Sequence, residues 1–470
     1  MWNDILALLK QELIIGLIIL ILLGIKISAA EWKIDNIIKL VNLLLMINFL
    51  AGFIMNAEGT LFNEMFHTSR LIVLEKNILN LAVLIISLQA YDWLKGHKHV
   101  LEFYALMLST LLGMFFMISG GNLLIFYLGL ELSTIPLAAI ANFDLGKRQS
   151  SEAAFKLIIS SAFSSCLLLF GISLIYGATG SLEFATISQQ LDGSALQLFA
   201  FILLLSGFCF KISVVPFHLW TADVYQGAPV AVTSYLSVVS KAAIFFVLIP
   251  VLYTVFKSLA GNWYPILFLL SVLTMLIGNL FAIRQDNLKR LLAFSSISQV
   301  GFILVGISGS SQAGSASVIY FTLIYIFSNL GAFGVIAFVS ALTGRENIED
   351  YKGLYTTNPL LSWVLAISLF SLAGIPPTAG FFGKFFLLMA GAGRGNYELI
   401  VIAALNMVIA LYYYLRVVKA IFMDSNERPV ETLKIPVLPK MAMLLCAGGI
   451  IITGFAGWVY DYIYSLSTGF

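Results

Sequence analysis

The chain has 470 residues, of which 60% are hydrophobic and only 11% are charged, and its mean hydropathy is +0.97. Soluble domains carry about a quarter charged residues, so this composition predicts an integral membrane protein. The formal net charge of +2 is too small to indicate nucleic-acid binding. The three cysteines, Cys166, Cys209 and Cys446, lie in apolar runs without metal-ligand spacing, which is typical of buried hydrophobic residues.

The apolar run at the start of the chain has to be distinguished from a cleaved signal peptide. Small residues follow it, as they would in a signal peptide, but Asp4 and Glu12 interrupt the positively charged region that such a peptide needs. The run is also too long for a signal peptide. We therefore expect a retained first transmembrane helix.

Long continuous apolar runs predict helices, because a membrane barrel would show short alternating strands. A helix that crosses a bilayer needs about 20 mostly apolar residues, and turn residues and charge clusters divide the chain into about 14 such segments. The predicted class is an all-α polytopic membrane protein. The expected helices are 5–26, 36–55, 71–92, 99–119, 121–142, 153–177, 196–226, 229–255, 264–283, 290–309, 316–342, 359–392, 397–420 and 439–463.

Lysine and arginine gather in alternate loops of this arrangement. If the N-terminus faces outward, the cytoplasmic loops carry most of them, which agrees with the positive-inside rule. The regions placed outside carry only Lys10, Arg70, Lys76, Lys257 and Arg394. Both termini are therefore predicted on the periplasmic side.

Four lysines lie within the expected helices, where a central lysine costs roughly 2.5–3.5 kcal/mol on insertion scales. Lys156 stands near a helix start, so its ammonium can reach the headgroup region along its apolar stem. Lys211, Lys241 and Lys384 lie too deep for this. Deep lysines mark ion pathways, and we expect that role for these three.

One glutamate, Glu131, lies centrally in the expected fifth helix. A lysine from a neighbouring helix can hold such a carboxylate in its charged form, provided that the two groups come within about 4–6 Å. Lys211 is the natural partner. The sequence therefore predicts a Glu131–Lys211 pair inside the membrane.

Prolines interrupt the two over-long segments close to their lysines. Pro216 has no N–H to donate and its ring clashes with the preceding turn, so the helix must kink or break just after Lys211. Carbonyls freed at the break, together with water, can then surround the ammonium. "GIPPTAG", with Pro376 and Pro377, predicts a second helix break of this kind shortly before Lys384.

Interrupted helices at matching places in two halves of a transporter indicate its ion pathway. The halves here are 99–255 and 264–420, each with five helices of which the fourth, overall helix 7 or 12, is broken. An odd number of helices makes the two repeats opposite in orientation. Residues 1–98 then form an N-terminal three-helix segment, and 421–470 a cytoplasmic loop with a last helix.

Sites for redox groups and nucleotides are missing from the pattern. "GAGRG" at 391–395 follows no strand, so it does not indicate a phosphate-binding loop. The dispersed cysteines do not suit an iron–sulfur cluster, and His67, His97, His99 and His218 do not suit a haem. A gradient or a partner must therefore supply the energy for ion movement.

Several blocks resemble the antiporter-like membrane subunits of respiratory complex I, a family shared with Mrp-type antiporter subunits. They are "FKISVVPFHLWTADVYQGAPVAVTSYLSVVSKAA" (210–243), "RQDNLKRLLAFSSISQVGF" (284–302), "YIFSNLGAF" (325–333) and "SLAGIPPTAGFFGKFF" (371–386). "ALYYYLRVV" (410–418) resembles the N-type branch in particular. The resemblance covers residues from about 100 to 420 and implies fourteen helices with two inverted repeats.

The resemblance also implies roles for the buried charges. Glu131 matches the family's glutamate on the fifth helix, and Lys211 matches its partner on the broken seventh helix. Lys241 matches the bridging lysine of the eighth helix. Lys384 matches the terminal lysine of the broken twelfth, where a sister subunit has glutamate, so it favours the N-type branch. Together they imply a proton channel.

A second set of polar residues is expected beside this channel: His218, Ser295, Ser298, Gln299 and Tyr412. Several relatives have histidine where this chain has Gln299. Glutamine cannot titrate, so a relay through this point would need water, and a packing role between helices is an equal alternative.

The resemblance implies that the chain itself binds no cofactor. NAD, FMN, iron–sulfur clusters and quinone are expected on partner subunits, where NADH oxidation drives pumping in a bacterial cytoplasmic membrane. The expected partners are the sister antiporter-like subunits, small membrane subunits and lipid, with no nucleic acid. One alternative is a D-type subunit of a multi-subunit Na⁺/H⁺ antiporter. Another is a structural scaffold with inert charges.

Overall fold

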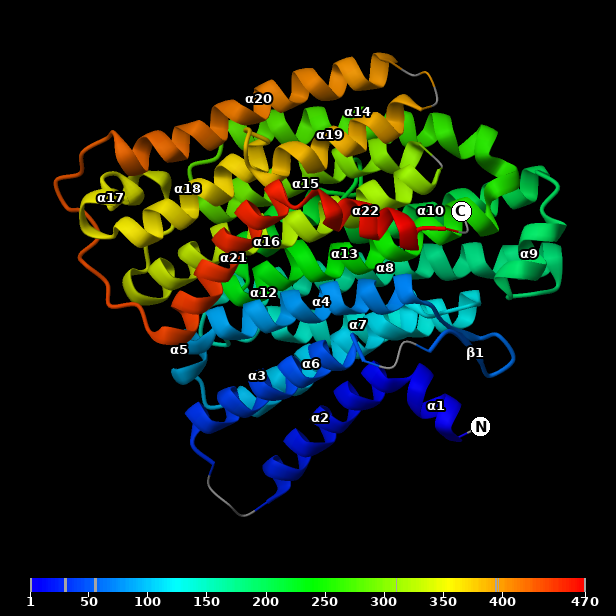
Figure 1. Cartoon of the computed structure of the whole chain (residues 1–470), viewed down its shortest axis with the longest axis horizontal. Helices are drawn as coiled ribbons and strands as arrows, with labels where there is room; N and C mark the ends of the chain where they lie inside the picture. The colour runs from blue at the N-terminus through cyan, green and yellow to red at the C-terminus, as the bar shows by residue number, and fades with distance from the viewer. Residues whose placement is uncertain are drawn as a thin grey trace.

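The computed structural model describes residues 2–28, 32–54, 57–309, 311–393, 395 and 397–468. Long helices run side by side along one direction, and the two termini lie at the same end of the bundle (Figure 1). Within the described ranges, twelve helices are long and apolar enough to cross a membrane, and Pro359–Ala373 and Ala379–Ala392 are shorter apolar helices. The predicted all-α membrane fold is confirmed.

The N-terminal segment differs in two details from the sequence prediction. The helix expected over 5–26 is divided at Leu9, and a two-stranded hairpin that was not predicted precedes the third membrane helix. Its strands pair antiparallel, with Gly59 opposite Thr68. The elements are α1 (Trp2–Leu8), α2 (Lys10–Ile27), α3 (Ile34–Ala51), β1 (Gly59–Leu61), β2 (Phe66–Thr68), α4 (Arg70–Gln89) and α5 (Tyr91–Lys95).

The first half contains the expected five membrane helices, the fourth of which is broken. The eighth membrane helix includes two π-helical stretches, one directly before Lys241. The elements are α6 (Val100–Ile118), α7 (Leu123–Ala141), α8 (Arg148–Thr179), α9 (Phe184–Gln190), α10 (Ala195–Ile212), α11 (Leu219–Gly227), α12 (Val230–Tyr235), η1 (Leu236–Ser240), α13 (Lys241–Pro250) and η2 (Val251–Val255). The short helix α9 was not predicted.

The second half has the same order of helices. The last membrane helix, expected to be continuous over 439–463, breaks at Ala456. The elements are η3 (Lys257–Leu259), α14 (Ala260–Ile283), α15 (Leu288–Ser308), α16 (Gln312–Thr343), η4 (Ile348–Tyr351), α17 (Leu354–Thr357), α18 (Pro359–Ala373), α19 (Ala379–Ala392), α20 (Tyr397–Phe422), α21 (Val437–Phe455) and α22 (Gly457–Leu466).

The same helix caps, β-bridges and helix-ending glycines occur at matching places in the two halves. Asn122 and Asn287 each cap a helix with the side chain, and each forms a bridge to the residues that follow the next helix. That next helix, α8 or α16, has 32 residues in both cases. Gly180 and Gly344 end these two helices in the left-handed conformation, which glycine adopts without strain. These recurrences agree with the two predicted repeats.

The two helix breaks are also built alike. The first pieces, α10 and α18, end at residues with positive φ, Ser213 at 65° and Gly374 at 84°. A cis X-Pro bond lies shortly after each, at Pro216 and Pro377. The positive φ turns the chain out of the helix, and the ring of Pro216 or Pro377 prevents the same helix from continuing.

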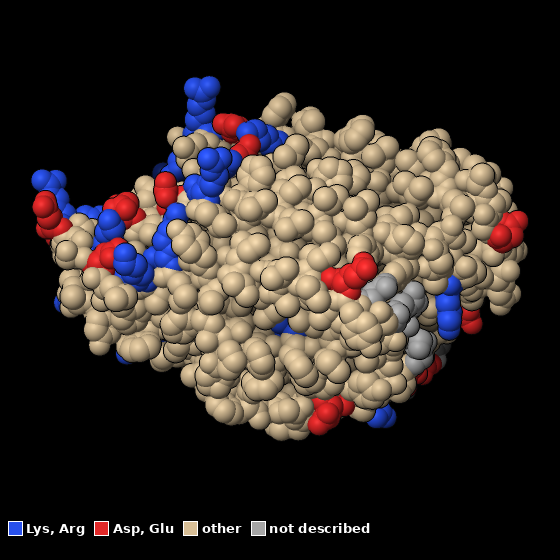
Figure 2. Space-filling view, turned by 90° about the horizontal axis from the view of Figure 1, so that it is seen from above, with Lys and Arg blue, Asp and Glu red and all other residues tan. Residues whose placement is uncertain are grey.

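Charged side chains lie mainly at the ends of the bundle, as expected for a protein that crosses a membrane. On the face seen in Figure 2, lysine and arginine gather mainly at the end opposite to the termini, mixed with acidic residues. On that face the surface between the ends is almost free of charge. Across the molecule the membrane helices expose apolar side chains such as Leu20, Phe163 and Val408. One prediction is wrong: Lys76, assigned to an outer loop, is buried within α4 with 1% of its surface exposed.

Helix α8 provides a matched test of packing. A Cβ added at Gly171 would lie 2.8 Å from Ala200 O and 2.8 Å from Leu204 N of α10, whereas Gly177 has nothing within 4 Å. Gly171→Ala is therefore expected to destabilise the protein by about 1–3 kcal/mol through overpacking. Gly177→Ala should leave stability unchanged or raise it, because alanine favours helix.

The melting temperatures of the two purified variants in detergent measure this difference. Equal melting temperatures would show that α8 and α10 can separate without cost.

Candidate functional site

Lys211 lies at the end of α10 among hydroxyl groups. Its Nζ donates to Ser161 Oγ on α8 at 2.7 Å and to Thr134 Oγ1 on α7 at 2.9 Å. Glu131 stands one turn before Thr134 and lies close enough for its charge to act on Lys211. Within the described ranges Glu131 forms no ion pair with this lysine, and its Oε1 is buried without a hydrogen-bond partner. Hydroxyls, and not the Glu131 carboxylate, are thus the direct ligands of the ammonium.

The break after Lys211 is satisfied by side chains of other elements. Trp220 Nε1 donates to Phe210 O at 3.2 Å, and Thr274 Oγ1 accepts from Val215 N at 3.1 Å. The expectation that freed carbonyls surround this ammonium is therefore wrong for Lys211. His218, at the start of α11, is 8% exposed, and its Nδ1 has no partner in the part of the chain that is described.

Lys241 is the first residue of α13 and follows the π-helical turn η1 directly. Such turns are rare and are frequent at functional sites, because they rotate the side chains that follow. Its Nζ donates to Ser296 Oγ of α15 at 2.8 Å and lies 5.6 Å from the ring centre of Tyr225. The hydroxyls of Tyr225 and Tyr325 lie beside Ser296 without meeting hydrogen-bond geometry. Lys241 is 1% exposed, so these groups replace water around it.

Lys384 is completely buried in α19 and uses the break in its own membrane helix. Its Nζ donates to Leu372 O at 2.7 Å and to Ala373 O at 3.4 Å, the last residues of α18. These carbonyls are free because the helix ends at Gly374. The "GIPPTAG" break therefore supplies the acceptors that the sequence predicted for Lys384.

Polar side chains of α15 join the surroundings of Lys241 to those of Lys384. Next to Ser296, Ser295 Oγ hydrogen-bonds to Tyr414 OH of α20. Gln299 Nε2 donates to Tyr414 OH at 3.2 Å and to Leu372 O at 3.0 Å. Leu372 O also accepts from Lys384, so hydrogen bonds connect Ser295 through Tyr414 and Gln299 to the acceptor of Lys384, while Lys241 binds the neighbouring Ser296; among the described residues no hydrogen bond joins the two serines. We call the groups from Lys241 to Lys384 the polar row.

Two of the other predicted residues take different places. Ser298 Oγ is buried without a partner among the described residues. Tyr412 is 61% exposed and does not face the polar row, whereas Tyr414 is buried in it. Two positions along a helix lie on nearly opposite faces, so Tyr414, which the sequence did not single out, faces α15 while Tyr412 does not.

Charged residues gather at the end of the bundle opposite to the termini. Asp223 Oδ2 lies 2.7 Å from Lys156 Nζ, and its Oδ1 lies 2.7 Å from Arg290 Nη1. Lys156 is 38% exposed, in agreement with a lysine that reaches the headgroup region. In the loop between α5 and α6, burial lowers the pKa of His97, against the opposing pull of Asp144 at 3.3 Å.

Comparison with known proteins identifies the class. The family described as "NADH:quinone oxidoreductase/Mrp antiporter, TM" matches residues 120–410. The fold, the paired helix breaks and this match define a membrane subunit of the antiporter-like class. This confirms the resemblance that the sequence blocks indicated.

Relatives then narrow the class to one family. NADH-quinone oxidoreductase subunit N of Phocaeicola vulgatus is 47% identical over 426 residues, which cover 90% of this chain and 90% of that protein. The subunit N of Azobacteroides pseudotrichonymphae is 45% identical over 469 residues, covering 98% and 97%. The chain belongs to the family of NADH-quinone oxidoreductase subunit N.

Solved structures agree with this family and fold. A chain of respiratory complex I from Thermus thermophilus with bound Aureothin matches with a TM-score of 0.80 and 28% identity, over 96% of this chain and 98% of that chain. A chain of the Mrp complex from Dietzia sp. DQ12-45-1b matches with a TM-score of 0.87 and 19% identity, over 99% and 97%. At 19% identity, the match to the Mrp complex chain shows that the two chains share a fold.

The geometry predicts different effects for two neighbouring tyrosines. Tyr414→Phe removes the hydroxyl that Ser295 and Gln299 share, which should cost about 1–3 kcal/mol because buried polar groups lose a partner. Tyr412→Phe changes an exposed side chain and should leave stability within error. The melting temperatures of the two variant proteins in detergent check the expectation. A Tyr414→Phe protein as stable as Tyr412→Phe would contradict the polar row.

Proposed function

We propose that this chain carries one proton path of a proton-pumping NADH-quinone oxidoreductase, through Glu131, Lys211, Lys241 and Lys384. The observation that carries the proposal is the polar row, in which the hydrogen-bond partners of two buried lysines reach consecutive serines of α15, Ser296 from Lys241 and Ser295 from the side of Lys384. Lysine is costly inside a membrane, so three buried lysines support a shared transport role.

Each transfer in this path conserves charge along the row. A lysine that donates a proton to a hydroxyl or a water becomes a neutral amine, and the acceptor passes a proton onward. Ser296 and Tyr414 can both donate and accept, so they can take part in such a relay. Gln299 cannot titrate, and we assign it a positioning role through its bonds to Tyr414 and Leu372 O.

Lys211 and Lys241 belong to separate hydrogen-bonded groups. Lys211 bonds to Thr134 and Ser161, while Lys241 bonds to Ser296. No hydrogen bond among the described residues connects these two groups, so water must complete the transfer, as it must between Ser296 and Ser295 and from Tyr414 to Lys384, where only an amide and a carbonyl lie between.

The energy would come from chemistry on other subunits. NADH oxidation and quinone reduction, with NAD, FMN and iron–sulfur clusters, are assigned to partners of this chain. The proposed neighbours are sister antiporter-like subunits, small membrane subunits and lipid. The name of the relatives and the match to a complex I assembly support this assignment.

Orientation and internal division are part of the same proposal. We place the end rich in lysine and arginine in the cytoplasm of a bacterium, which puts both termini in the periplasm. We assign 1–98 to an N-terminal segment, 99–255 and 264–420 to the two repeats, and 421–470 to the loop and last helix. The recurring caps and breaks support this division.

Two alternatives make different predictions. A D-type subunit of an Na⁺/H⁺ antiporter would exchange ions without electron transfer, and the relatives favour complex I over it. An inert scaffold would keep full pumping after the loss of Lys211. The contacts of the lysines with titratable or hydroxyl groups favour transport.

Lys211→Ala in the assembled complex tests the proposal. We expect normal assembly, loss of most proton pumping, and slowed or uncoupled NADH-quinone turnover, because the path loses its first buried carrier. Pumping and quinone reduction are followed together in vesicles, with and without sodium. Lys257→Ala, at an exposed lysine outside the path, is the control and should pump normally.

Normal pumping by Lys211→Ala would contradict the proposed path. Proton exchange that needs sodium and no NADH, in the wild-type protein, would assign the chain to the antiporter function instead.

A further inference from the structure

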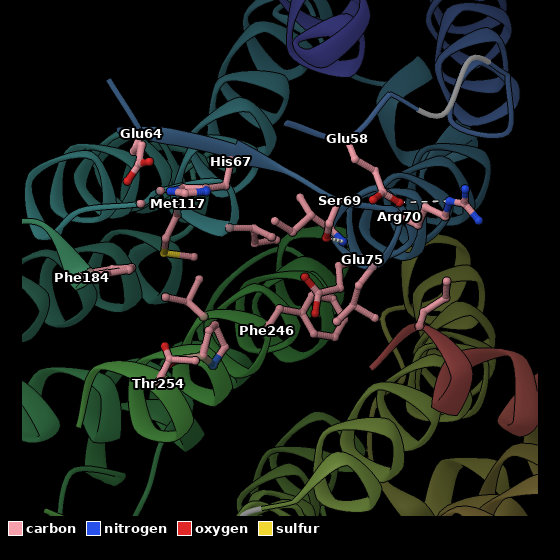
Figure 3. A pocket seen from close by; sticks show the side chains of 18 of the residues that line it. Glu58, Glu64, His67, Ser69, Arg70, Glu75, Met117, Phe184, Phe246 and Thr254 are labelled. Atoms are coloured by element: carbon pink, nitrogen blue, oxygen red, sulfur yellow. Dashed lines mark hydrogen bonds and ion pairs between the residues drawn. The ribbon is translucent and has the colours of Figure 1, made fainter. Parts of the chain in front are cut away.

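A cavity of about 760 Å³ opens at the end of the bundle that carries both termini (Figure 3). The hairpin β1–β2 and the start of α4 form one wall, and Ser465 and Leu466 of α22 lie at its edge. Phe246, Val247 and Pro250 of α13 form part of the opposite side. The cavity thus lies between the start of α4 and the later part of α13, the helix that begins with Lys241.

Glu75 of α4 reaches into this cavity from its base (Figure 3). Only 4% of its surface is exposed, yet it has no hydrogen bond or ion pair within the described parts of the chain. An ionised carboxylate buried without a partner is very costly, whereas the neutral acid is far less so. Glu75 therefore needs either a proton or a ligand from the cavity.

The charges around Glu75 do not supply a partner. Lys76, the next residue, is bound to Glu12 of α2 at 2.5 Å, and both side chains are buried. Lys10 of α2 donates to Ile54 O. At the rim, Arg70 lies 3.0 Å from Glu58, so its charge is already compensated.

The remaining titratable groups at the rim are acidic or neutral. They are Glu64 and His67 of the hairpin region and Glu183 at the start of α9. α13 and α22 place no charged side chain in the wall. An acidic rim concentrates hydronium and other cations at the mouth of a cavity.

The walls favour a proton over a metal cation. Calcium needs six to eight oxygen ligands and magnesium needs an octahedral set. Glu75 offers one carboxylate at the base, and Phe246, Val247 and Pro250 offer no side-chain oxygen. Water, in contrast, can fill a polar cavity of this size and carry protons.

We propose that Glu75 is a proton-exchange site that water reaches from the end of the bundle carrying the termini. In one direction, hydronium in the cavity gives its proton to the Glu75 carboxylate and becomes water. In the other direction, the neutral acid returns the proton to water. This inference rests on the proposed function and adds a group outside the Glu131–Lys384 path.

The position of the site connects it with that path. Lys241 begins α13, and Phe246 in the cavity wall follows five residues later, a rise of about 7.5 Å. The cavity therefore ends within about two helical turns of the middle lysine. A proton-exchange site here would serve the path from the terminus-bearing face.

Water access is tested first, in the assembled complex with exposed Cys166 replaced by Cys166→Ser. Glu75→Cys should react with a membrane-impermeant maleimide added on the side of the termini, and not from the other side. Leu79→Cys, one turn along α4 and completely buried, should not react. A Glu75→Cys protein that does not react from the terminus-bearing side would overturn the inference.

Protonation is tested in vesicles with Glu75→Gln and Glu75→Asp. Glu75→Gln should assemble, pump protons several-fold more slowly and lose sensitivity to the pH on the terminus-bearing side. Glu75→Asp keeps a carboxyl and should restore both properties. Wild-type pumping and pH response in Glu75→Gln would contradict the inference.

The maleimide reaction does not depend on pumping. Normal pumping by Lys211→Ala with a reactive Glu75→Cys would therefore reject the proposed path while leaving the water-accessible site in place.

Discussion

The constraint on which this structure depends is that no backbone polar group can stay unpaired in a bilayer. Continuous helices satisfy it along most of the described membrane segments; besides the divisions at Leu9 and Ala456, the exceptions are the two breaks after Ile212 and after Ala373. There the chain must provide other partners, and it does so with Trp220 and Thr274 at the first break and with Lys384 and Gln299 at the second. Polar side chains are consequently held deep in the protein by the backbone that they satisfy.

The two breaks therefore have different consequences although they are built alike. At the first, side chains from α11 and α14 satisfy the break, and Lys211 is left to bind the hydroxyls of α7 and α8. At the second, the carbonyl of Leu372 accepts from Lys384 and Gln299 together. Only the second break joins the polar row directly. The two repeats therefore use their breaks differently. The first break is satisfied by side chains of other helices, whereas the second binds Lys384 through its free carbonyl.

The sequence predicted those features that hydropathy and proline determine locally. The twelve described helices that are long and apolar enough to cross a membrane, the shorter pair α18 and α19, and both breaks lie where apolar length and Pro216 or Pro377 place them, whereas the divisions at Leu9 and Ala456 were not predicted. The hairpin β1–β2 was missed because its strands have three residues each, too few to show an alternating pattern. Tyr414 was missed for another reason. Three tyrosines in succession point in different directions, and only tertiary packing decides which one faces α15.

The chemistry of the partners distinguishes the buried lysines from each other. Lys76 is held by Glu12 at 2.5 Å, so removing its proton would leave a buried carboxylate uncompensated, which is strongly unfavourable. Lys211, Lys241 and Lys384 bind hydroxyls and carbonyls, and those neutral groups remain satisfied by a neutral amine and water. A lysine with neutral partners can lose and regain a proton without breaking an ion pair. Lys76 therefore fits a structural role and the other three a transport role, a distinction that burial alone does not make.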